Sequence, residues 1–186
     1  SFKLMIKGVK ICGISDITTL THILDHDFPP KFIGFICDYK KSKRYVSYER
    51  LKTLLNVDRK NTNFVSVLVN PKNEVLERMK KLNFDFLQLY NVEPKKTKMI
   101  KEKYGIKIIT ALTIIDQNDV NEYKNYMGIS DIFLFDGKGY EKSIGFDHKL
   151  LNSVPKSLNK MIAGNIKLDD IPKFNDMDIY VDISGA

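Results

Sequence analysis

The sequence predicts a small (β/α)8 barrel, in which eight parallel strands alternate with helices. Eight short runs rich in Ile, Val and Phe recur along the 186 residues, and amphipathic segments separate them. The runs are nearly continuous rather than alternating, which is typical of parallel strands buried on both faces. An open doubly wound sheet is the alternative, but eight uninterrupted βα units favour the closed barrel. The expected strands are Val9–Cys12, Phe32–Cys37, Phe64–Val69, Phe84–Leu89, Ile106–Leu112, Ile132–Phe135, Lys160–Ala163 and Ile179–Ile183.

The segments between the strands carry helix signals. Pro94 and Gly105 bracket a lysine-rich helix, since proline favours the first helical turn and glycine the end. Pro155 is expected to end or kink the segment before it. The other expected helices follow Ser15/Asp16, Ser47, Pro71, Asp116 and Asp147, and Lys167–Phe174 is expected to form a shorter helical turn.

The length suits one barrel domain over residues 1–186, although the fold usually takes about 250 residues. The sequence stops soon after the eighth strand, where a last helix is expected and apparently missing. No apolar run reaches the length of about 18 residues that spans a bilayer, and no secretory signal opens the chain. We therefore expect a cytoplasmic protein without a membrane partner. Its two cysteines, Cys12 and Cys37, are then expected to be reduced thiols, with a lone disulfide as the alternative.

The net charge of +7 is compatible with a nucleic-acid surface or with attraction for an anionic metabolite. The basic residues are spread along the chain rather than gathered in one stripe laced with aromatic residues. This favours ordinary solvated lysines, and we expect no nucleic-acid partner. The sequence does not predict the oligomeric state.

Chemically capable side chains stand where the strands end. Carboxyl ends of parallel strands meet at one face of a barrel, where such folds place their active sites. A thiol, carboxylates, an arginine, amides and glycines would converge there, which is typical of a catalytic or binding site. These strand-end residues are Cys12, Asp38 with the loop to Arg44, Asn70, Gln88 with Tyr90, Thr110, Asp136, Gly164 with Asn165, and Asp182 with Ser184.

The order of these motifs resembles the phosphoribosylanthranilate isomerase family of tryptophan biosynthesis over nearly the whole chain. Lys10–Ile14 (KICGI) and Lys41–Ser47 (KSKRYVS) together are specific to that family. The remaining motifs are weak when taken alone: Gly34-Phe35, Val67–Asn70, Gln88-Leu89, Leu134–Asp136, Phe146-Asp147, Ile162–Gly164 and Val181–Gly185.

The resemblance implies an Amadori rearrangement of N-(5′-phosphoribosyl)anthranilate to the 1-deoxyribulose 5-phosphate derivative. It makes Cys12 the thiolate base that removes the C2 proton and Asp136 the acid that protonates the ring oxygen. We expect the barrel mouth to lower the pKa of Cys12 and apolar walls to raise that of Asp136. The alternative without a catalytic role is that Cys12 is a buried structural thiol at the strand end and that Asp136 stands in an ordinary turn.

The resemblance also assigns substrate contacts. Arg44 would pair with the anthranilate carboxylate, because a planar guanidinium group can donate two hydrogen bonds to a planar anion. The alternative is that Arg44 is simply solvated. Asp182 would contact the ribose hydroxyls or merely brace its strand, and Gln88 is a further substrate-binding residue. No cofactor or metal is implied, and a third ligand is lacking near the His22/His26 pair. The phosphate would lie against the backbone of Gly164, Asn165, Ser184 and Gly185.

The chain departs from the family pattern at several of these positions. Tyr90 replaces a histidine, Asn165 replaces a glycine, one serine before Gly185 is lost, and the loop containing Gly139–Gly145 is shorter. Lost glycines restrict close backbone approach to an anion, although Lys142 supplies a charge. Two interpretations therefore stay open: a working isomerase with altered loops, or a barrel of the same descent that binds a ligand or acts on another sugar phosphate.

Overall fold

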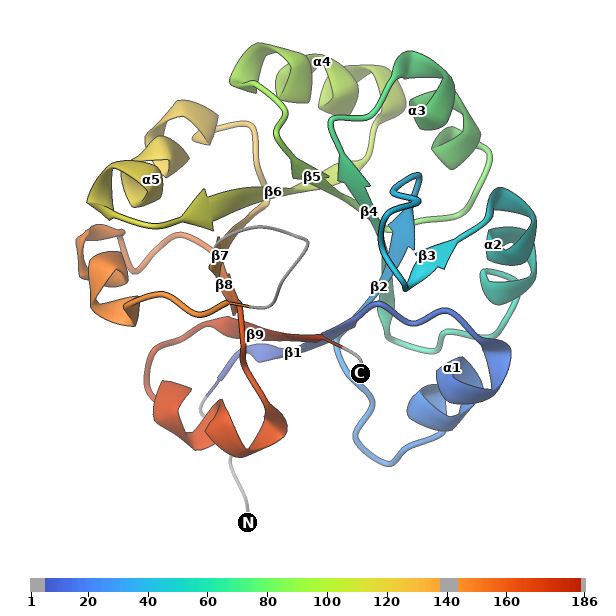
Figure 1. The fold of residues 1–186 in the computed structure, drawn as a ribbon, viewed down its shortest axis with the longest axis horizontal. Coiled ribbons are helices and arrows are strands. Elements are labelled where there is room, and N and C mark those ends of the chain that lie inside the picture. Colours follow the sequence, from blue (N-terminus) through green and yellow to red (C-terminus); the bar gives the residue numbers. More distant parts are fainter. Residues whose placement is uncertain (1–5, 138–143, 185–186) are drawn as a thin grey trace.

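The predicted barrel is confirmed in a computed structural model that describes residues 6–137 and 144–184. Eight parallel strands follow one another around the ring, and pairing of the first with the second closes it (Figure 1). In ring order, the strands are β1 (Gly8–Cys12), β9 (Tyr180–Ser184), β8 (Lys160–Ala163), β7 (Ile132–Gly137), β6 (Lys107–Ile114), β5 (Phe86–Tyr90), β4 (Asn63–Val69) and β2 (Phe32–Cys37).

One additional strand, β3 (Tyr45–Val46), pairs with the end of β2 outside the ring. It lies within the KSKRYVS motif, which the sequence alone did not identify as a strand. Two residues are too few to show a period of alternation, so no pattern could have indicated it. The short strand fixes the loop after β2 against the barrel, and Arg44 immediately precedes it.

Helices and turns form an outer ring around the strands (Figure 1). The first four are regular, and two of them begin at a capping side chain: Asp16 and Ser47 accept hydrogen bonds from backbone N–H groups three residues on. Gly105 ends its helix in the left-handed conformation, as predicted. The helices are α1 (Ile17–Leu24), α2 (Tyr48–Leu54), α3 (Asn73–Lys80), α4 (Pro94–Tyr104) and α5 (Gln117–Asn121), followed by the 3₁₀ segments η1 (Glu122–Tyr126), η2 (His148–Ser153) and η3 (Leu168–Phe174).

Two expectations about the helices were wrong in detail. Pro71 does not open a helix, because α3 begins at Asn73 with Lys72 as its cap. The segments after Asp116 and Asp147 were expected to be ordinary helices, but the first continues as 3₁₀ and the second is 3₁₀ throughout. Each has only a few apolar positions, so tertiary packing rather than helical propensity determines its geometry.

Alternation along each strand divides the core into an interior and a shell. Residues such as Phe32, Val65 and Leu134 fill the barrel interior, while residues such as Phe35 and Leu68 pack outward against the helices. Because side chains two apart on a strand share a face, the polar side chains near the strand ends also open into the interior. The apolar interior cluster that includes Phe32, Val65 and Leu134 lies below these polar side chains and forms the floor of the site.

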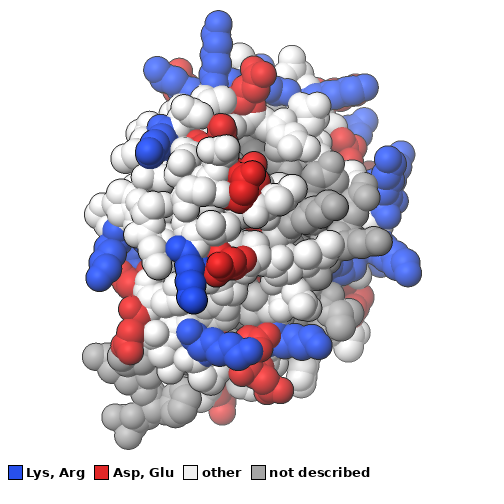
Figure 2. Space-filling view, turned by 60° about the vertical axis from the view of Figure 1, so that its left-hand side comes forward, with Lys and Arg blue, Asp and Glu red and all other residues white. Residues whose placement is uncertain are grey.

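The face drawn in Figure 2 carries mixed charge rather than one basic stripe. In Figure 2, acidic side chains lie among the lysines and arginines over the visible face. No helix in the described part of the chain has the length and apolar character needed to cross a bilayer.

Candidate functional site

Cys12 is the last residue of β1, and its side chain packs against the interior cluster of the barrel. Lys10 lies two residues earlier on the same face and is completely buried. Both residues lie beside Gly34 on β2. A Cβ added at Gly34 would stand 3.0 Å from the Cys12 Sγ and 3.3 Å from the Lys10 Nζ. Gly34 therefore leaves the space in which the thiol and the ammonium group meet.

Lys10 forms a buried ion pair with Asp182. The Nζ atom lies 2.9 Å from Oδ2, and the two residues are direct partners in the register of β1 and β9. Burial alone would lower the pKa of Lys10, but the charges of Asp182 and Cys12 and their hydrogen bonds raise it above its ordinary value. Lys10 therefore remains a cation beside the thiol. Sequence reasoning did not select it, although it stands inside the KICGI motif.

The pKa of Cys12 moves in the direction opposite to our expectation. Burial raises it above its ordinary value, and Asp182 raises it further, while Lys10 and Arg44 lower it. The predicted lowering was wrong because the cost of burying a thiolate exceeds the attraction of the two cations. Cys37 is a fully buried thiol whose pKa is raised to about 12, as expected for a structural residue. Both cysteines are free.

Asp136 is nearly buried on β7, and Tyr90 on β5 donates a hydrogen bond of 2.7 Å to its Oδ2 atom. Burial raises the pKa of Asp136 to about 7, partly offset by Tyr90 and Lys10, and Asp182 adds to the rise. The expectation of a raised pKa is therefore confirmed. The charges of Asp136, Asp182 and Cys12 all raise the pKa of Tyr90, so these groups share one interior space.

Arg44 reaches the site from the loop between β2 and β3. Its Nη1 atom donates a hydrogen bond of 3.2 Å to the carbonyl oxygen of Cys12. The side chain lies over Gly13, which has a φ of +91° and where an added Cβ would stand 2.8 Å from the Arg44 Cζ. Arg44 as a residue is half-buried, and its bond to Cys12 holds the side chain at the rim.

Two buried acceptors in the site have no hydrogen-bond partner among the described residues. They are Asp182 Oδ1 and Gln88 Oε1. Leaving such atoms unpaired costs free energy, and a ligand that supplies hydroxyl donors would recover it. Thr110 does not belong to the site, because β6 continues to Ile114 and the Thr110 hydroxyl bonds to Ser130 instead.

The residues expected to hold a phosphate stand at the ends of β8 and β9. Gly164 has a φ of +108°, and an added Cβ there would stand 2.8 Å from the Gly137 nitrogen and against the Ile144 carbonyl oxygen. Asn165 follows in the left-handed region, and Ser184 is exposed at the strand end. Two further positions of that expectation, Lys142 and Gly185, lie outside the described residues.

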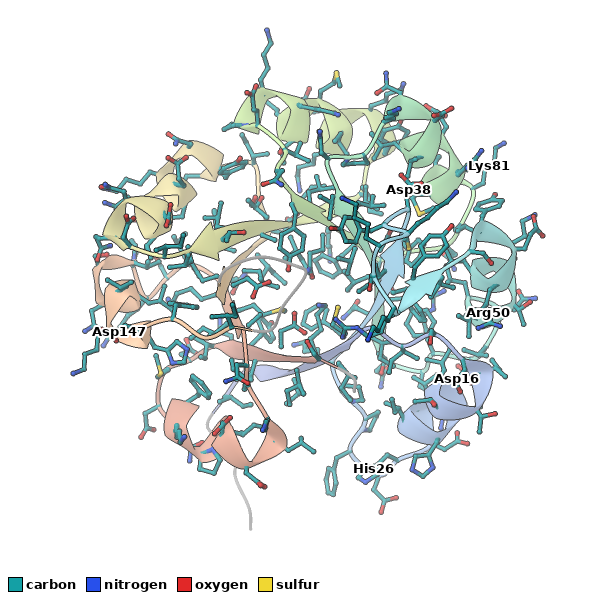
Figure 3. All side chains as sticks on the ribbon, in the orientation of Figure 1. Asp16, His26, Asp38, Arg50, Lys81 and Asp147 are labelled. Atoms are coloured by element: carbon teal, nitrogen blue, oxygen red, sulfur yellow. The ribbon has the colours of Figure 1, made fainter. Side chains whose placement is uncertain are left out.

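Charged and imidazole side chains of the outer ring lie away from this site, and His26 of the His22/His26 pair is one of them. Asp16, His26, Arg50, Lys81 and Asp147 are all in the outer ring of helices and loops (Figure 3). Within residues 6–137 and 144–184, no three His, Cys, Asp or Glu side chains are placed to hold a metal ion.

The chain is similar in sequence to one family of known enzymes. The sequence model of the N-(5′-phosphoribosyl)anthranilate (PRA) isomerase family matches residues 9–186. N-(5′-phosphoribosyl)anthranilate isomerase of Rhizobium leguminosarum bv. trifolii is 30% identical over 172 residues, covering 88% of this chain and 76% of the relative. The Brucella canis enzyme of the same name is 30% identical over 176 residues, covering 90% and 78%.

Solved structures share the fold. A phosphoribosyl anthranilate isomerase in complex with reduced 1-(o-carboxyphenylamino)-1-deoxyribulose 5-phosphate superposes with a TM-score of 0.80 at 22% identity, covering 95% of this chain and 86% of the other. The Thermus thermophilus isomerase superposes with a TM-score of 0.76 at 19% identity, with the same coverage. The matched length and the identity to the curated relatives show that the chain belongs to the N-(5′-phosphoribosyl)anthranilate isomerase family of tryptophan biosynthesis.

Proposed function

We propose that this isomerase uses Cys12 as its general base and Asp136 as its general acid. The reaction is the Amadori rearrangement of N-(5′-phosphoribosyl)anthranilate. The proton of Asp136 passes to the ring oxygen as the bond from C1 to that oxygen breaks, which leaves an iminium ion. The Cys12 thiolate then takes the proton from C2, and the resulting enamine tautomerises to the ketone. No atom is gained or lost overall.

The observation that carries the assignment is the raised pKa of Asp136 within the space that Cys12 also enters. A carboxyl group with a pKa of about 7 retains its proton over much of the neutral range, which an ordinary aspartate does not. The acid is therefore available where the substrate ring would lie. A plain turn aspartate, the alternative considered from the sequence, would be exposed and hydrogen-bonded to nearby backbone N–H groups.

Cys12 acts as a base through its thiolate, which is the minority form of the side chain at neutral pH. Because burial raises its pKa, only a small share of Cys12 is thiolate near neutral pH. Lys10 hydrogen-bonds the sulfur and stays cationic, so it stabilises the thiolate when that form appears. A less acidic thiol gives a more basic thiolate, which partly compensates for its scarcity in proton abstraction.

The proposed substrate contacts use Arg44 at the rim and the buried oxygens that have no hydrogen-bond partner among the described residues. We assign Arg44 to the anthranilate carboxylate, and Gln88 and Asp182 to the ribose hydroxyls through their unpartnered oxygens. The phosphate is assigned to Gly164, Asn165 and Ser184 at the ends of β8 and β9. A single barrel domain over residues 1–186, a cytoplasmic location, independence of cofactors and the lack of a nucleic-acid partner all stay predictions.

The test is turnover of fluorescent N-(5′-phosphoribosyl)anthranilate by the protein and two variants. Cys12→Ala and Asp136→Asn are each expected to lower kcat about a hundredfold or more, as loss of an acid or base usually does. Cys37→Ala and Asp147→Asn are the matched controls, because one removes a buried thiol and the other a carboxylate outside the site. A near-normal rate in either site variant would refute that assignment.

A further inference from the structure

The hydrogen bond between Tyr90 and Asp136 links two strands that are not neighbours, β5 and β7. At 2.7 Å it has the ordinary length of an O–H···O hydrogen bond, and both residues are more than nine-tenths buried. The phenol is held in its protonated form, because burial and the charges of Asp136, Asp182 and Cys12 raise its pKa well above the ordinary value. Tyr90 is therefore a hydrogen-bond donor at every working pH.

Gln88 makes a second, longer contact to the phenol that is compatible with that direction of donation. Its Nε2 atom donates to the Tyr90 oxygen over 3.4 Å. The phenol accepts this bond and directs its own hydrogen toward Asp136. Both residues point into the interior from β5, two positions apart, so strand alternation places them together.

We propose, on the basis of the isomerase function assigned above, that Tyr90 is a positioning residue that determines which oxygen of Asp136 carries the acidic proton. Oδ2 accepts the Tyr90 hydrogen, so the proton that Asp136 donates resides on Oδ1. Without the phenol, the proton is distributed over both oxygens, and the carboxyl group rotates about its own axis. Tyr90 itself does not contact the reacting atoms.

The same contact helps the acid after it has reacted. Once Asp136 has given its proton to the ring oxygen, the carboxylate still accepts the Tyr90 hydrogen, and a hydrogen bond to an ion is stronger than one to a neutral group. The bond therefore favours proton donation. The other ionisable groups that act on this pair are Asp182, Lys10 and Cys12, from β9 and β1.

Tyr90 is one of the positions at which the chain departs from the family pattern, and its support of Asp136 gives that departure a role. The resemblance placed a histidine at position 90, and this chain has a tyrosine there. A histidine titrates near neutral pH and its donor state changes with pH, whereas the buried phenol keeps its proton. In this chain the support of Asp136 is therefore independent of pH over the working range.

The test is Tyr90→Phe, which keeps the ring and removes only the hydroxyl group. We expect kcat to fall about tenfold to hundredfold, the range for a lost hydrogen bond to an ion, with KM changed less than about threefold. We also expect the limb of the pH profile that reports Asp136 to move to higher pH. Tyr126→Phe is the matched control, because that buried phenol donates to the Val92 carbonyl oxygen outside the site.

A second measurement does not depend on activity. Carbon-13 NMR of aspartate carboxyl groups reports the titration of Asp136 directly, and its pKa is expected to be higher in Tyr90→Phe than in the unchanged protein. If Tyr90→Phe does not fold, the Asp136 titration is measured in Gln88→Met instead, and the pKa of Asp136 is expected to rise by less, because the phenol loses the bond it accepts from Gln88. The kcat of this variant is not used, since Gln88 is also assigned to the ribose. Normal kcat and an unmoved Asp136 titration, with Asp136→Asn inactive, would overturn the role of Tyr90 alone. Activity in Asp136→Asn would overturn the proposed function itself.

Discussion

Replacing Lys10 by methionine tests whether the buried ion pair supports both the fold and the thiol. Lys10 is completely buried with its Nζ 2.9 Å from Asp182, and that carboxylate has no other hydrogen-bond partner among the described residues. Methionine fills similar space without charge. Breaking one half of a buried pair usually costs about 3–5 kcal/mol, because the remaining charge is left unpaired. For a chain of this size, that corresponds to a fall in Tm of about 6–20 °C.

The double variant Lys10→Met/Asp182→Leu separates stability from catalysis. Replacing both partners by apolar residues is often neutral, so we expect it to recover at least half of the lost free energy of unfolding. Activity is not expected to return, because Cys12 has lost the cation beside it and the ribose has lost Asp182. Urea unfolding gives the free energies, and fluorescence of the substrate gives the rates. Lys52→Met is the matched control, since its pair with Glu49 is exposed and is worth less than about 1 kcal/mol.

The pH dependence of stability supplies a second check on the same pair. The pKa of Lys10 is raised in the folded protein, so the folded state binds this proton more tightly than the unfolded chain. The resulting stabilisation is fully present below the unfolded value of about 10.5 and is lost as the pH rises through the folded pKa. The Lys10→Met variant should lack this alkaline loss. If Lys10→Met lowers the free energy of unfolding by less than about 1 kcal/mol and the variant keeps its activity, the reasoning is refuted.

Three further predictions concern the site. The proposed mechanism requires protonated Asp136 and ionised Cys12. It therefore predicts that kcat/KM is level between pH about 7 and the thiol pKa and falls on both sides; a profile level down to pH about 4 would contradict this. Arg44→Ala is expected to raise KM about tenfold or more with a smaller change in kcat, and a loss confined to kcat would exclude Arg44 as a ground-state anchor. Gly13→Ala is expected to displace Arg44 and raise KM as well, whereas Gly128→Ala, with a φ of +79° and open space around it, should lose only stability.

The barrel itself was predictable because its signal is repeated. Each strand is a short continuous run of apolar residues, and the predicted Phe32–Cys37 and Lys160–Ala163 match β2 and β8 residue for residue. Where the carboxyl ends differ, polar residues at the barrel mouth continue the ladder. β6 extends to Ile114 through Thr113, which made a strand end appear at Leu112. That error put Thr110 into the site, although it faces outward to Ser130.

The site was predictable only in part, because its most buried charges look ordinary in a sequence. Cys12, Arg44 and Asp136 were selected by their positions, and the structure brings all three to the same end of the barrel. Lys10 escaped notice because a lysine inside an apolar run is indistinguishable from one at a strand edge until the strand closes into a ring. Tyr90 was noted only as a replaced histidine, since its partner stands 46 residues away in the chain.

The direction of the Cys12 pKa shift shows how burial affects the proposed base and the proposed acid together. Burial raises the pKa of both, which favours a protonated acid and disfavours an ionised base. Between the two pKa values, each unit of pH gives ten times more thiolate and ten times less protonated acid, so the productive share stays constant. A barrel mouth that was more exposed would release more thiolate but would also ionise Asp136 near the ordinary carboxyl pKa of about 4. The buried Lys10 favours the ionised form of the thiol beside it, and although its charge also lowers the pKa of Asp136, burial still holds that pKa at about 7.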